Sequence, residues 1–145
     1  MFISLVHWRN RKNFLNLIVK FLGDEISVFY FAENFRDILF DEEAQEAMVT
    51  LMEKEVFSFP EETETIKIIY FRIMLDRIER TIIDLLDIFS NDIELNSSLS
   101  LTTIYPEIVD AQLPFPLSKR IEEFRKELIK IFFRSQIIKD GLLDI

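Results

Sequence analysis

The sequence has 145 residues, of which 49% are hydrophobic and 30% are charged. This length and composition are typical of one domain, so we expect residues 1–145 to form a single unit whose core needs no metal or crosslink. The chain has no cysteine, which excludes disulfides, thiolate metal sites and cysteine nucleophiles. Its formal net charge of −9 argues against direct binding to nucleic acid.

The N-terminal stretch is apolar first and basic afterwards, with Met1–Trp8 preceding Arg9. A secretory signal has the opposite order, and no run reaches the roughly 20 apolar residues that a bilayer span requires. We therefore expect a cytoplasmic protein without a membrane partner. His7 is the only histidine in the chain, and its apolar setting favours a packing role over a catalytic one.

A first helix is expected from about Asn10 or Asn13 to Leu22, because apolar residues recur there at helical spacing. Gly23 suits the left-handed position that follows many helices. The chain has only two glycines, whereas sheet proteins with tight hairpins usually need more. This scarcity, together with long runs of helix-forming residues, predicts an all-α protein.

Two further helices are expected on either side of residue 40. Asp24 can cap the first of them, and its apolar stripe comprises Val28, Phe31, Phe35, Ile38 and Leu39. Residues 26–31 also fit a strand, but the continuing period of 3.6 favours a helix. The carboxylates of residues 41–43 open the next helix, where they are favourable against its dipole. Its predicted apolar stripe comprises Ala44, Ala47, Met48, Leu51 and Met52.

The longest helix is expected from about Pro60 to Phe89, a span of about 45 Å. Its predicted stripe comprises Ile66, Ile69, Tyr70, Ile73, Met74, Ile78, Ile82, Leu85 and Phe89. Residues 90–103 are rich in Ser, Asn and Thr and predict a loop. A short piece at Glu107–Gln112 and a last helix from about Leu117 complete the chain. The predicted architecture is a compact bundle of about five helices with one long central helix.

Negative charge is concentrated between residues 24 and 64, where thirteen acidic residues stand against two basic ones. Acidic residues often do no more than cap helices and keep a protein in solution. At this density they also predict a surface that repels nucleic acid and attracts a basic groove. The candidate partner-binding residues are Glu42, Glu43, Glu46, Glu53, Glu55, Glu61, Glu62 and Glu64.

Phe115 is a further candidate, because Pro114 and Pro116 hold it on a stiff loop. Such an apolar anchor can dock into a partner, although packing over one end of the bundle is the favoured role. The basic residues of the last helix are interleaved with acidic ones, and the acidic character of the whole chain argues against DNA binding by this helix. We expect these basic residues to pair with the acidic helices or to make a second contact to the partner.

No catalytic, cofactor or metal site is expected. One histidine cannot supply a metal-binding pair, and two isolated glycines cannot form a phosphate-binding loop. Carboxylate pairs such as Glu42 with Glu46, or Glu122 with Glu123, arise by chance on helices of this composition. We therefore expect a binding protein rather than an enzyme, with no small-molecule substrate.

In length, in its cysteine-free Ile- and Phe-rich composition and in its charge balance, the chain resembles RNA polymerase inhibitory proteins of two-tailed archaeal viruses. Those proteins are similar to a helical-bundle virion protein of the same virus. The resemblance covers the whole chain and rests on general character without a short motif. It implies a viral protein in the host cell cytoplasm that enters the positively charged DNA-binding channel of the archaeal multisubunit RNA polymerase.

In that channel the protein would hold the mobile clamp and prevent promoter DNA from loading, so that transcription initiation is blocked. A row of carboxylates suits this role, since it can take the place of DNA phosphates in a basic channel. The alternative is a structural helical-bundle subunit of a virion or scaffold, which would bury apolar faces against copies of itself.

Overall fold

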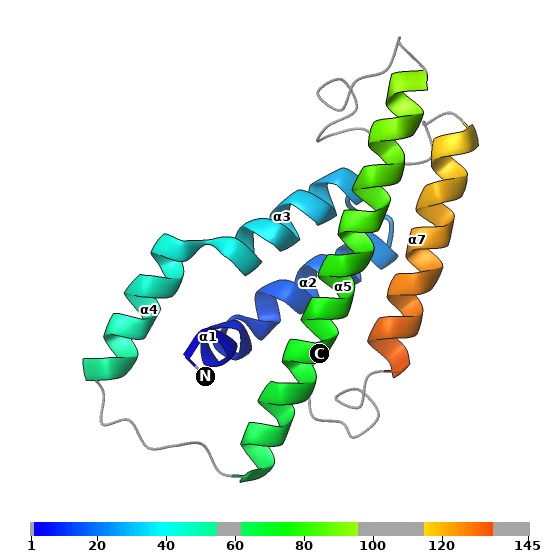
Figure 1. Cartoon of the computed structure of the whole chain (residues 1–145). Helices are drawn as coiled ribbons and strands as arrows, with labels where there is room; N and C mark the ends of the chain where they lie inside the picture. The colour runs from blue at the N-terminus through cyan, green and yellow to red at the C-terminus, as the bar shows by residue number, and fades with distance from the viewer. Residues whose placement is uncertain (1, 55–61, 96–114, 135–145) are drawn as a thin grey trace.

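The computed structural model describes residues 2–54, 62–95 and 115–134, and every regular element in these ranges is a helix (Figure 1). The helices are α1 (Phe2–Arg9), α2 (Arg11–Leu22), α3 (Val28–Phe40), α4 (Glu42–Lys54), α5 (Glu62–Leu95) and α7 (Phe115–Arg134). The predicted all-α class with one long helix is confirmed.

Helix α5 has 34 residues, or about 51 Å at 1.5 Å per residue, and forms the spine of the fold. Helix α7 packs along it in the opposite direction, as the colours in Figure 1 show. Helix α1 packs against both α5 and α4, while α2 packs against α3. Helix α4 therefore contacts the rest of the molecule mainly through α1, and much of the surface of α4 is not covered by other helices.

Helix α1 was not predicted, and its burial explains why. Four consecutive residues, Leu5, Val6, His7 and Trp8, are all buried. A run of four buried residues has no polar face, so the period of 3.6 does not appear in it. His7 is buried, as its apolar setting predicted, and is only 3% exposed.

Phenylalanine rings join the helices at the centre. Phe14 from α2 meets Phe35 of α3 at 5.1 Å and Phe71 of α5 at 6.0 Å, both edge to face. Phe21 stacks on Phe31 at 5.1 Å. Such pairs contribute about 0.5–1.5 kcal/mol beyond their buried area. The predicted stripe of α3 is confirmed, with Val28, Phe31, Phe35 and Leu39 buried and Ile38 partly buried.

In the turn after α2, the left-handed residue is Asp24 and not Gly23, which the sequence had predicted. Gly23 has a φ of −88°, whereas Asp24 has a φ of 59°. The N–H of Glu25 donates to the Lys20 carbonyl at 2.9 Å, and the N–H of Asp24 donates to that of Phe21 at 3.1 Å. These two bonds form a Schellman motif with Asp24 at its left-handed position.

The sequence predicted that Asp24 is the N-cap of α3, and this prediction is wrong. That role belongs to Ser27, whose hydroxyl accepts a hydrogen bond from the N–H of Tyr30 at 3.1 Å. The side chain of Asp24 instead accepts from Nη2 of Arg125 at 2.7 Å. Arg125 also donates from Nη1 to the carbonyl of Phe21 at 3.1 Å and lies over the Phe21 ring. One residue of α7 thus closes the end of α2.

The core-facing side of α5 is rotated from the predicted stripe. Ile68, Phe71 and Leu75 are buried, whereas Ile69 and Ile73 are exposed by 52% and 44%. Of the other predicted residues, Met74, Ile78, Ile82 and Leu85 are buried and Ile66 and Tyr70 are exposed. The error arose because the first half of α5 has apolar residues on two sides.

Other boundaries also moved. Helix α5 continues to Leu95 through the first residues of the predicted 90–103 loop, and α7 begins at Phe115 rather than Leu117. The predictions for Pro60 and for Glu107–Gln112 lie outside the described residues. In α4, two members of the predicted buried stripe, Ala47 and Leu51, are exposed, since α4 touches the rest of the fold along a narrow contact.

Candidate functional site

The acidic candidates gather on α4. Glu42, Glu43, Glu46 and Glu53 are all exposed. Glu42, Glu46 and Glu53 share one side of the helix, since they are four and eleven residues apart. Glu62 and Glu64 belong to the first turn of α5, but their side chains lie outside the described set, as do Glu55 and Glu61 altogether.

Phe115 does not lie on a stiff loop. It is the first residue of α7, so the predicted loop anchor is wrong about its local structure. A proline in the first turn of a helix costs no hydrogen bond, which explains how Pro116 follows within the helix.

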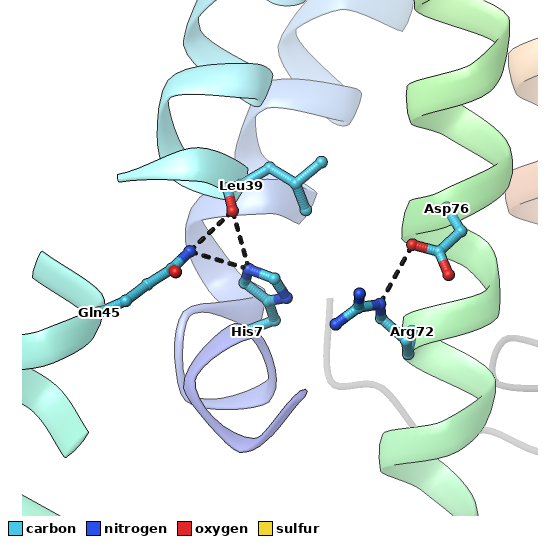
Figure 2. A network of polar contacts seen from close by, with 5 residues as sticks. All are labelled: His7, Leu39, Gln45, Arg72 and Asp76. Carbon is cyan, nitrogen blue, oxygen red and sulfur yellow. Dashed lines mark hydrogen bonds and ion pairs between the residues drawn. The ribbon is translucent and has the colours of Figure 1, made fainter. Parts of the chain in front are cut away.

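A pocket of about 330 Å³ lies where α1, α3, α4 and α5 meet. Its lining residues are His7, Leu39, Phe40, Glu42, Gln45, Arg72, Asp76 and Glu79. Figure 2 shows His7 between Gln45 on one side and the α5 residues Arg72 and Asp76 on the other. Glu42 belongs both to this pocket and to the acidic side of α4, so the two features form one continuous surface.

His7 and Gln45 together close the carboxyl end of α3. His7 Nε2 lies 3.1 Å from the carbonyl oxygen of Leu39, and Gln45 donates from Nε2 to the same oxygen at 2.7 Å (Figure 2). Because a carbonyl oxygen only accepts, we assign the ring proton of His7 to Nε2, which then donates to Leu39. The two side-chain nitrogens, 3.3 Å apart, are then two donors brought together by one acceptor.

The second ring nitrogen of His7, Nδ1, has no hydrogen-bond partner among the residues that the structure describes. Among the described residues, two buried side-chain polar atoms lack a hydrogen bond, His7 Nδ1 and Arg36 Nε. Arg36 Nε lies 3.8 Å from a carboxylate oxygen of Glu79, which lines the pocket. Both atoms that lack a hydrogen bond therefore lie at the pocket or next to a residue that lines it. A buried polar group without a partner costs about 1–3 kcal/mol, so such a cluster calls for an explanation.

Burial lowers the pKa of His7 below its ordinary value of 6.5, because desolvation penalises the charged ring. The hydrogen bond to Leu39 raises the pKa, the charge of Arg72 lowers it, and the charge of Asp76 raises it. Burial is the largest of these effects, so His7 is neutral at pH 7. With the proton on Nε2, its Nδ1 is a buried acceptor.

The charges around the pocket are mostly negative. Arg72 pairs with Asp76 at 3.1 Å within α5, and Arg36 pairs with Glu79 at 3.8 Å. Glu42 makes no ion pair with any other described residue. The three carboxylates thus outnumber the two guanidinium groups, and the arrangement suits a positively charged donor better than an anion.

The described residues contain no group of three His, Asp or Glu side chains placed to hold a metal ion. No family model, curated protein or solved structure matches this chain at a significant level. None of the described helices is long and apolar enough to cross a membrane.

Sequence reasoning found the acidic helix but not the pocket. Its residues come from four helices, and His7 and Gln45 are separated by 38 positions. The one available signal was a lone histidine in an otherwise apolar stretch, which indicated burial and not what the buried ring would contact.

Proposed function

We propose that this protein binds a basic groove of a partner through the acidic side of α4, and that the groove is the DNA-binding channel of an archaeal multisubunit RNA polymerase. The observation that carries the proposal is the set of exposed carboxylates on α4, namely Glu42, Glu43, Glu46 and Glu53. The choice of polymerase rests on the resemblance to inhibitory proteins of two-tailed archaeal viruses.

The physical basis is electrostatic. Carboxylates in a row can occupy sites that hold DNA phosphates, where charge neutralisation supplies much of the affinity. Helix α4 contacts the rest of the fold mainly through α1, and Glu43, Glu46 and Glu53 are exposed, while Glu42 lies at the edge of the pocket. An exposed row of carboxylates on a helix is suited to a basic channel. Occupying the channel and its clamp would prevent promoter DNA from loading, without any chemical step.

The test compares two charge-matched variants. The first replaces Glu43, Glu46 and Glu53 with Gln, and the control replaces three exposed α7 residues, Glu122, Glu123 and Glu127, with Gln. Exposed charges mainly set association rate and salt dependence. We expect the α4 variant to bind archaeal RNA polymerase more slowly, with a flatter salt dependence, and to release promoter-dependent transcription. The control should behave as the parent.

If both variants inhibit and associate as the parent does, α4 is only a solvated surface and the proposal is wrong. An equal loss in both would mean that net charge matters and the position of α4 does not. Circular dichroism of both variants checks that the helices are retained.

A second candidate function is a structural subunit of a particle, and one feature favours it. Ile66, Ile69, Tyr70 and Ile73 are exposed at helical spacing on α5, on the side away from its buried residues. Phe133 of α7 is also exposed, by 55%. Apolar side chains arranged in this way are suited to packing against another copy.

Light scattering after size-exclusion chromatography separates the two candidates. A structural subunit should grow in mass with concentration, and Ile69→Lys together with Ile73→Lys should prevent that growth. A channel-binding inhibitor should keep one small mass at every concentration, and the same lysine variant should still bind polymerase.

A further inference from the structure

The pocket at His7 joins three features that the core packing does not use. It holds a buried nitrogen acceptor without a partner, it has more carboxylates than guanidinium groups, and it opens beside the acidic side of α4. The acidic side chains alone would be an ordinary solvated surface. His7 Nδ1 adds an independent demand, since a side chain that is 3% exposed has an acceptor that no described residue satisfies.

These features define the chemistry of a partner group that would bind in this pocket. Nε2 of His7 donates to Leu39, so Nδ1 can only accept, and its partner must carry an N–H or O–H donor. An anion would be repelled by Glu42, Asp76 and Glu79, which line the same pocket. A positively charged donor satisfies Nδ1 and the carboxylates together.

We propose that this pocket receives an arginine side chain from the partner that the acidic side of α4 binds. This inference rests on the proposed function and adds the group that anchors the complex. A guanidinium presents five N–H donors in a planar fork, so one edge can bond to His7 Nδ1 while the others remain for the carboxylates that line the pocket, among them Glu42. The volume of about 330 Å³ is ample for that planar group.

Access to Nδ1 depends on Arg72. Its guanidinium lies on the α5 side of the His7 ring in Figure 2, and its side chain is 40% exposed. It is held there by a pair with Asp76 one helical turn away, an interaction that is weak at a surface. An incoming arginine therefore competes with Arg72 for one side of the pocket. Displacing Arg72 costs little free energy, because only a weak surface ion pair is broken.

The experiment uses the single histidine as its probe. The whole chain is labelled with ¹⁵N-histidine, and the two ring nitrogens of His7 are followed by NMR during a titration with N-acetyl-arginine amide. This compound presents an arginine side chain without free terminal charges. Tetramethylammonium is the matched control, because it has the same charge and no donor. Putrescine is a third arm that represents free metabolic amines.

We expect a saturable change at Nδ1 with the arginine compound, with a dissociation constant of about 1 mM, which is reasonable for one side chain. Tetramethylammonium should leave Nδ1 unchanged. Glu42→Gln should weaken binding about fivefold, while Asp84→Asn, an exposed carboxylate further along α5, should have no effect. Arg72→Ala should tighten binding, because it removes the competing guanidinium.

The proposal is overturned if Nδ1 does not respond to the arginine compound, if tetramethylammonium produces the same change, or if only putrescine binds. It is also overturned if Nδ1 is already hydrogen-bonded in the parent and becomes unbonded in Arg72→Ala, since Arg72 would then fill the role itself. These outcomes leave the test of Glu43, Glu46 and Glu53 untouched, so failure of the pocket is distinguishable from failure of the acidic helix.

Discussion

At two helix ends in this molecule, side chains from elsewhere in the chain donate hydrogen bonds to the terminal carbonyls. The two ends differ in whether all the polar atoms involved have hydrogen-bond partners. At the end of α2, Arg125 donates to the carbonyls of Phe21 and Leu22 and to Asp24, and it lies over an aromatic ring. At the end of α3, His7 and Gln45 both donate to Leu39, and one buried nitrogen of His7 has no hydrogen-bond partner in the described part of the chain.

The difference separates a structural contact from a site. The guanidinium of Arg125 has its partners within the described fold, so the end of α2 stabilises the molecule. The end of α3 carries an unsatisfied acceptor beside a pocket and an acidic surface. Unpaired buried polar groups in a native protein are expected where function needs them.

The largest expected loss of stability comes from removing the aromatic ring at the end of α2. Phe21→Ala removes a fully buried ring that contacts Phe31 and Phe124, and it should cost about 3–5 kcal/mol of unfolding free energy. Phe40→Ala at the pocket should change stability by about 0.5 kcal/mol or less, since Phe40 is 55% exposed. Urea denaturation of both variants measures the contrast, and equal losses would contradict it.

A smaller loss is expected from Arg125→Met, which keeps the apolar stem over Phe21 and removes the donors. It leaves the partly buried carbonyls of Phe21 and Leu22 without this partner, at a cost of about 1–3 kcal/mol. The exposed pair with Asp24 adds little. Asp24→Asn is the control, because asparagine tolerates the left-handed φ of 59° and still accepts from Arg125. A larger loss in the control than in Arg125→Met would contradict this account.

His7→Phe should be almost neutral, with a change of about 1 kcal/mol or less. It removes the hydrogen bond to Leu39, but Gln45 still donates to that carbonyl, and the unpaired Nδ1 disappears with the ring. Thermal and urea unfolding beside the parent give the value. A loss as large as that of Arg125→Met would mean that His7 serves the fold as Arg125 does.

The pH dependence of stability should also report His7. Burial lowers the pKa of His7 in the folded state below its ordinary 6.5, so the unfolded chain takes up the proton first as the pH falls. Stability from this group is therefore present above pH 6.5 and is lost as the pH falls toward the lower folded value. Between pH 7.5 and 5, the parent should lose more stability than His7→Phe. Identical losses would show that His7 titrates normally.

The sequence predicted the parts of the fold that have one apolar side. The stripe of α3 was correct, because Val28, Phe31, Phe35 and Leu39 all face the core. The prediction failed for α1, where Leu5, Val6, His7 and Trp8 are all buried, and for the first half of α5, where Ile69 and Ile73 continue an apolar pattern on the exposed side. Burial and exposure there depend on neighbouring helices, which a local period does not describe.

For the candidate site, the sequence supplied the charge but not the geometry. The acidic stretch could be read directly, and Glu42, Glu43, Glu46 and Glu53 are exposed as a binding surface requires. The pocket could not be predicted, because His7, Gln45 and Asp76 come together only when α1, α4 and α5 pack. The left-handed position of Asp24 was missed because the sequence favoured the neighbouring Gly23, whereas the hydrogen bonds of the turn place Asp24 there. The contact of Asp24 with Arg125, 101 residues away, could not be read from the sequence.

The most direct test of the contrast between the two helix ends is the protonation of the His7 ring in the protein alone. The chain has one histidine, so the ¹⁵N spectrum of its ring has a single assignment. We predict that at pH 7 the proton lies on Nε2 and that Nδ1 gives the signal of an unprotonated nitrogen without a hydrogen bond. A proton on Nδ1, or an Nδ1 that is already hydrogen-bonded, would show that the end of α3 is as complete as the end of α2.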